Sequence, residues 1–240
     1  MALDDGAAGK VDSASALALV ARICRAGVRS IPVAGVAVSV MTSGGHRGVV
    51  FVTDDTARSL EDVQFIAGEG PGCDAFAWGR AVLVSDLGVA DERDGAWPAF
   101  REAARAVGVR AVFAFPLLLG AATLGALTAY RLGEEALTGL ALARAVRLAD
   151  AAAVAVLDVI VGADHGRSAA AGDGDDGDEV VDAQMYRAEV YQAAGVLMVQ
   201  LAVGIETAMV RLRAYAFASG RPIAEVARAI VGHDLLLGAE

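Results

Sequence analysis

An acidic, glycine-rich spacer divides this chain of 240 residues into two parts. The spacer begins at Gly162 and ends in the run Gly-Asp-Gly-Asp-Asp-Gly-Asp at residues 172–178. Such a segment cannot bury apolar surface and its charges repel one another, so we expect a mobile linker over residues 162–180. The length of the chain predicts one or two domains. Residues 1–13 are expected to form a disordered tail.

The charge of the chain is unevenly distributed. The formal net charge is −10, of which residues 162–182 contribute −6, whereas residues 183–240 carry five basic and five acidic side chains. A negative surface argues against nonspecific nucleic-acid binding by the whole protein, and the neutral last part permits RNA binding without indicating it. Cys24 and Cys73 lie far apart and provide neither a disulfide framework nor metal-ligand spacing. The acidic N-terminus lacks the basic region of a signal peptide, which predicts a cytoplasmic protein.

Residues 111–130 form an uncharged run whose length alone would allow a membrane span. Pro116 interrupts the run, and Gly120-Ala121 fits a two-residue hairpin turn with glycine first. Apolar side chains alternate on both sides of that turn, which is typical of strands. The sequence therefore predicts a buried β-hairpin and no contact with a membrane.

The first part of the chain mixes helices with short strands. Helices are expected from Ser13 or Ser15 to Ala26, with Gly27 as the stop, after Asp54 or Asp55, after Pro71, and over residues 97–107 and 137–161. Strands are expected over residues 36–41, 49–52 and 81–84, in addition to the hairpin at 110–131. This order predicts an α+β fold, with an antiparallel sheet flanked by helices.

Several local motifs of this part resemble those of GAF domains, which are small-molecule or signal-sensing modules. The matching residues are Leu60, Gln64-Phe65, Gly68-Glu69-Gly70-Pro71, Asp74-Ala75, Gly79-Arg80-Ala81-Val82, Asp86, Trp97-Pro98, Phe100 and residues 108–117. The resemblance covers about residues 14–160. It implies a GAF-like sensor domain at 14–161 with an unknown small-molecule ligand, and the sequence indicates no particular cofactor.

Three groups of side chains in the first part are candidates for a chemical site. Cys73 begins a predicted helix and could be activated there, as in the GAF-fold reductase of free methionine sulfoxide, but Cys24 is the only other thiol. His46 is expected to be a solvated turn residue, and Glu69 and Asp86 to be solvated carboxylates. Nothing assembles a nucleophile, a base and an oxyanion site, so neither catalysis nor a metal is expected. The spacer also lacks the ligand order of a helix-loop-helix calcium site.

Residues 181–240 show the periodicity of three amphipathic helices. Tyr186, Val190, Ala193, Leu197 and Leu201 recur at steps of three and four, which places them on one helical face. A glycine at 204 is expected to end this helix, and a proline at 222 to begin the third one. The three helices predict a small all-α domain.

The same region resembles the ANTAR family, an RNA-binding output module that lets transcription pass terminators in bacteria. The resemblance covers roughly residues 183–235 and is carried by Tyr-Gln-Ala-Ala-Gly-Val-Leu-Met at 191–198, Arg-Ala-Tyr-Ala at 213–216 and Arg-Pro-Ile-Ala-Glu-Val-Ala at 221–227. It implies that an input domain triggers dimerisation, and that the pair of modules clamps two small RNA stem-loops.

The resemblance indicates which side chains could touch RNA. The candidates are Arg187, Gln192, Arg211, Arg213 and Arg221. Ala194 stands where the family usually has a lysine, and the loss of a phosphate-facing cation lowers affinity and its salt dependence. The leading interpretation is therefore a signal-responsive RNA-binding antitermination regulator that forms a homodimer. The alternative is a sensor and dimerisation protein whose ANTAR domain no longer binds RNA.

Overall fold

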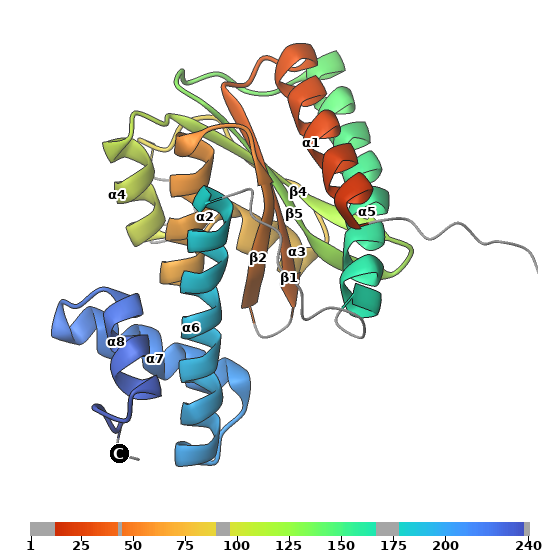
Figure 1. Cartoon of the computed structure of the whole chain (residues 1–240). Coiled ribbons are helices and arrows are strands. Elements are labelled where there is room, and N and C mark those ends of the chain that lie inside the picture. Colours follow the sequence, from red (N-terminus) through yellow and green to blue (C-terminus); the bar gives the residue numbers. More distant parts are fainter. Residues whose placement is uncertain (1–12, 43–44, 90–96, 167–177, 238–240) are drawn as a thin grey trace, which may run out of the picture.

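A five-stranded antiparallel sheet forms the centre of the first domain in the computed structural model, which describes residues 13–42, 45–89, 97–166 and 178–237. The strand order is β2-β1-β5-β4-β3, with β1 at Gly35–Thr42, β2 at Gly45–Val52, β3 at Val82–Val84, β4 at Ala111–Leu119 and β5 at Ala122–Arg131 (Figure 1). The expected antiparallel sheet is confirmed.

The uncharged run at 111–130 is the β4–β5 hairpin. Leu119 pairs with Ala122 across the two-residue turn, and Gly120 adopts the left-handed φ of +60° that this turn requires. The prediction of a hairpin is thus confirmed. No single helix of the described residues has the length and apolarity to cross a membrane, although the bent pair Ala188–Leu201 and Ile205–Ser219 passes that test by length and composition.

Two long helices, α1 (Ser13–Ser30) and α5 (Gly139–Gly166), cover one face of the sheet (Figure 1). Alternate strand residues such as Val36, Phe113 and Phe115 point into this layer and are fully buried. Gly27 does not end α1, contrary to the sequence prediction. A Cβ atom at Gly27 would lie 2.5 Å from Leu148 Cδ2, so the glycine allows α1 and α5 to pack closely.

Three shorter helices cover the other face of the sheet: α2 (Asp55–Ala67), α3 (Pro71–Trp78) and α4 (Pro98–Ala106). Asp54 caps α2 as expected, because its Oδ1 accepts a hydrogen bond from the Ala57 amide at 2.9 Å. The same oxygen accepts a 2.8 Å hydrogen bond from the Tyr130 hydroxyl on β5. The start of α2 is therefore fixed to the sheet, and its other end points toward the second domain.

The second domain consists of α6 (Asp178–Leu201), α7 (Ile205–Ser219) and α8 (Ile223–Val231) (Figure 1). These are the three predicted helices. The expected linker falls largely outside the described residues, but α5 continues to Gly166 and α6 already begins at Asp178. The expected N-terminal tail also lies outside the described residues, except for Ser13, which begins α1.

Candidate functional site

The three C-terminal helices share one apolar core. Glycine breaks separate them: Gly204 caps the start of α7, and Gly220 ends it with a left-handed φ of +63°. The fully buried side chains that α6, α7 and α8 contribute to this core are those of Val190, Ala193, Ala194, Leu197, Ala208, Met209, Leu212, Val226, Ala227 and Ile230. Arg228 on α8 adds an ion pair to Glu189 on α6, with 3.4 Å between Nε and Oε2. Residues 188–237 thus form a folded unit rather than separate helices on the sensor.

One residue of the first domain belongs to this core. Phe65, in the last turn of α2, is fully buried and clusters with the apolar residues of α6, α7 and α8. Its ring centroid lies 6.0 Å from that of Tyr191 on α6, within the range of favourable aromatic pairs. The end of α2 is therefore one place where the two domains meet, and α6 also contacts β2.

Arg213 on α7 makes a polar contact at the same junction. Its Nη2 donates a 3.0 Å hydrogen bond to the backbone carbonyl of Phe65. That carbonyl belongs to the last turn of α2, where carbonyls lack intrahelical partners and the helix dipole is negative. Burial lowers the pKa of the Arg213 guanidinium from its usual value. A cation thus lies against the negative end of a helix in a partly water-excluded position.

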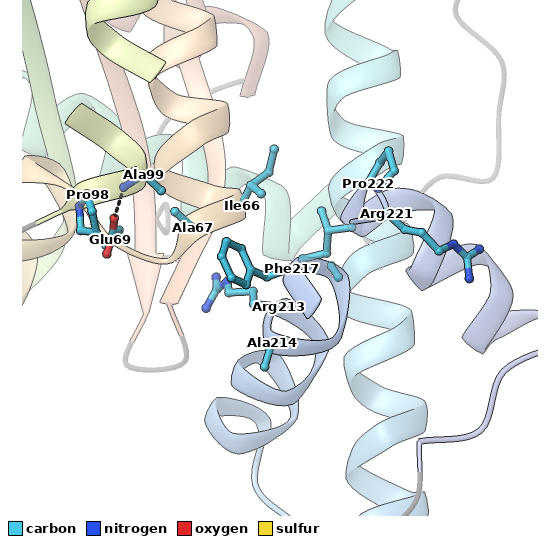
Figure 2. A pocket seen from close by; sticks show the side chains of 12 residues that line it. Ile66, Ala67, Glu69, Pro98, Ala99, Arg213, Ala214, Phe217, Arg221 and Pro222 are labelled. Atoms are coloured by element: carbon cyan, nitrogen blue, oxygen red, sulfur yellow. Dashed lines mark hydrogen bonds between the residues drawn. The ribbon is translucent and has the colours of Figure 1, made fainter. Parts of the chain in front are cut away.

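An open cavity of about 520 Å³ lies between the two domains beside this contact. Ile66 of α2 and Phe217 of α7 line it from the two sides, and the Phe217 side chain is 90% exposed (Figure 2). Glu69 also lines it, and its Oε1 accepts a 3.0 Å hydrogen bond from the Ala99 amide. The other lining residues are Ala67, Pro98, Arg213, Ala214, Ala216, Arg221, Pro222 and Ile223. Volume and apolar lining fall within the range of small-molecule sites.

The predicted RNA-contacting residues are not gathered on one surface. Gln192 on α6 and Arg211 on α7 are exposed, whereas Arg213 is partly buried in the junction. Arg211 and Arg213 are two positions apart, so they are turned by about 200° around α7 and face nearly opposite directions.

The remaining two candidates for RNA contacts are Arg221 and Arg187. Arg221 is exposed beside the cavity and pairs with Glu225 one turn on, with 3.7 Å between Nε and Oε2. An exposed pair of this kind contributes little to stability and can be exchanged for a phosphate contact. The side chain of Arg187 lies outside the described residues, although its backbone is part of α6.

Ala194, in place of the family lysine, is fully buried in the core that contains Phe65. From the sequence, this position was expected to lie on the RNA-facing surface. In the docked arrangement a lysine here would have to bury its charge or move the neighbouring helices, both of which are unfavourable. The small alanine fits the junction instead.

A polar network inside the first domain was missed by the sequence analysis. Glu61 on α2 is fully buried, and its carboxylate accepts hydrogen bonds from the Ser39 hydroxyl at 2.5 Å and the Gln64 side-chain amide at 2.9 Å. Gln64 Oε1 in turn accepts a 2.7 Å hydrogen bond from the Gly72 amide. The network ties α2 to β1 and α3. Its only sequence signal was the Gln64-Phe65 pair among the GAF-like motifs.

The candidate reactive groups do not form a catalytic site among the described residues. Burial raises the pKa of the Cys73 thiol to about 12, and that of Cys24 likewise to about 12, so neither thiol is activated. Asp86 accepts a hydrogen bond from the Gly88 amide at 2.6 Å, and Glu69 accepts the one from the Ala99 amide. Over the described residues no group of three or more His, Cys, Asp or Glu could hold a metal ion, and the His46 side chain lies outside them.

The family model of the GAF domain matches residues 15–156, which is more than half of the chain. The chain belongs to the GAF domain family. The ANTAR domain model matches residues 179–231, so the GAF domain is followed by an ANTAR domain. No curated protein matches this chain at a significant level. Both regions agree with the resemblances stated from the sequence.

The chain is also similar to several solved structures. A domain of a two-component sensor histidine kinase protein from Sinorhizobium meliloti is 14% identical, with 64% of this chain and 96% of that one covered at a TM-score of 0.47. The type II free methionine-R-sulfoxide reductase from Thermoplasma acidophilum is also 14% identical, with 61% and 96% covered and a TM-score of 0.47. The GAF domain of the cyanobacteriochrome TePixJ is 18% identical, with 67% and 98% covered and a TM-score of 0.44.

Proposed function

We propose that this protein is a signal-responsive RNA-binding regulator that acts in transcription antitermination. The observation that carries the proposal is the order of domains: a sensor of the GAF family precedes a compact ANTAR module. The input would be a signal received by the GAF domain, and the output would be two paired modules that hold two RNA stem-loops. Gln192, Arg211, Arg213, Arg221 and Arg187 remain the proposed RNA contacts.

Exposed apolar side chains on α5 support pairing of two chains. Leu140 is 61% exposed, Val154 55% and Val161 45%, and these three lie within one side of the helix. We expect Val154→Asp to shift the protein toward monomer in light scattering across a concentration series. Val107→Asp is the control, because Val107 is also 45% exposed but lies at the end of α4. A wild-type chain that is monomeric at every concentration would contradict the pairing.

RNA binding is tested by gel shift with a two-hairpin RNA over a salt series that starts at about 50 mM. Arg211→Ala removes an exposed cation from α7, and Arg105→Ala removes one from α4 of the GAF domain, away from the pairing surface on α5. If Arg211 contacts phosphate, its loss lowers the slope of log affinity against log salt by about 0.7–0.9, while Arg105→Ala leaves the slope unchanged. Equal slopes for both variants would exclude Arg211 from the RNA surface.

A second function is favoured by specific contacts of the module. Ala194 is buried, Arg213 is bound to the GAF domain, and Arg221 and Arg228 pair with carboxylates. These contacts fit a sensor that uses its last domain only to associate with other chains. Absence of any RNA retardation at the lowest salt, with pairing intact in light scattering, would establish this second function over the first.

A further inference from the structure

An arginine of the ANTAR-like stretch at 213–216 contacts the GAF domain. Arg213 spans from α7 to the last turn of α2, where its Nη2 donates to the Phe65 carbonyl at 3.0 Å. The ring of the same Phe65 is buried in the core of the module. Phe65 of the GAF domain therefore makes both a polar and an apolar contact with the ANTAR module.

The buried guanidinium of Arg213 is only partly hydrogen-bonded. The Nε atom of Arg213 is buried and has no hydrogen-bond partner among the described residues. Burying an N–H group of a cation without a partner is unfavourable. An RNA phosphate offers that group a charged acceptor, so the docked state and an RNA-bound state compete for the same guanidinium.

Resting on the proposed function, we propose that Arg213 is a latch that keeps the module in an RNA-incompetent state. While its guanidinium lies on the end of α2, Arg213 cannot reach RNA. Release of the latch frees Arg213 and weakens the docking of α7 on the GAF domain, to which the buried ring of Phe65 also contributes. The signal sensed by the GAF domain thus acts on the module through the last turn of α2.

Gly68 provides a way to open the latch without changing Arg213. This residue ends α2 with a left-handed φ of +70°, and an added Cβ would lie 2.7 Å from Nη1 and 2.8 Å from Cζ of Arg213. Gly68→Ala therefore displaces the guanidinium. Gly79→Ala is the matched control, because Gly79 ends α3 with a φ of +60° and its added Cβ would meet nothing within 4 Å. Both substitutions introduce the same backbone strain.

The first readout is independent of RNA. In the full chain, amide hydrogen exchange of α7 and α8 is expected to be roughly tenfold or more faster in Gly68→Ala than in Gly79→Ala, because the module samples the undocked state more often. If Gly68→Ala does not fold, Arg213→Gln against Arg211→Gln makes the same comparison on α7. Equal exchange in the two members of each pair would overturn the latch.

The second readout is affinity for the two-hairpin RNA, measured by fluorescence anisotropy on the same variants. We expect Gly68→Ala to bind at least about fivefold more tightly than Gly79→Ala, because the docked state no longer competes. Faster exchange with equal RNA affinity would show that the contact holds the module without controlling it, which overturns the inhibitory role. Faster exchange with no RNA binding by any variant would leave the docking contact in place and refute the proposed RNA-binding function.

Discussion

Phe65 is expected to stabilise the association of the two domains more than the fold of its own domain. Its backbone belongs to α2, whereas its fully buried ring lies in the core of the ANTAR module. Truncation of a fully buried phenylalanine to alanine costs about 3–5 kcal/mol. Of this, about 0.5–1.5 kcal/mol belongs to the ring pair with Tyr191, so Phe65→Leu should cost only about 1 kcal/mol.

The lost free energy should mainly weaken the association of the two domains. A loss of about 3 kcal/mol changes the docking equilibrium by roughly two orders of magnitude, which makes the undocked state measurable. Hydrogen exchange of the full-length Phe65→Ala protein should therefore be faster across α6, α7 and α8, while the amides of β1 and β5 keep their wild-type protection. Urea unfolding should separate into two transitions, because the two domains no longer support each other.

Phe100→Ala is the matched comparison for this variant. Phe100 is also a fully buried phenylalanine, but it lies on α4 within the apolar cluster of the GAF domain. Its loss should raise exchange throughout the sheet and its helices, with no preference for the module. If Phe65→Ala and Phe100→Ala raise exchange in the same segments by the same factors, Phe65 is an ordinary core residue of the GAF domain and the reasoning about the junction fails.

Three further outcomes are expected. Burial raises the pKa of both thiols, Cys24 and Cys73, to about 12, so in the native protein at pH 8 they should react with a thiol reagent about 100-fold or more slowly than free cysteine. In denaturant both should react at the normal rate. Fast labelling of the native protein would contradict this. Burial, with the hydrogen bond to a carboxylate, likewise raises the pKa of Tyr130 to about 12. Because these three groups hold their protons to higher pH when folded, the stability that they contribute is complete below about pH 9 and is lost as the pH rises. We therefore expect the urea midpoint to fall between about pH 9 and pH 12, and an unchanged midpoint over this range would refute the shifts. Gly125→Ala should destabilise the GAF domain by about 3 kcal/mol or more, since the added Cβ would lie 1.9 Å from a backbone oxygen of β1, whereas Gly48→Ala meets nothing within 4 Å and should be nearly neutral in thermal melts.

Local patterns predicted most of the fold because each element had its own signal. The Gly120-Ala121 turn, the cap at Asp54 and the alternation along β4 depend on neighbouring residues only. The prediction that Gly27 ends α1 was wrong because it, too, used neighbouring residues only. A glycine within an apolar helical pattern has the same local appearance whether it ends the helix or lies against a neighbour such as Leu148.

By itself, the sequence determined two domains, their helices and strands, and the family to which each is similar, because periodicity, turn residues and charge act over short stretches of chain. The tertiary structure decided what those residues do at the junction. Phe65 and Arg213 are 148 positions apart and carry no mutual signal in one sequence, since their contact depends on where the end of α2 meets α7. Likewise, only packing shows that Ala194 is buried and that Arg213 faces the sensor.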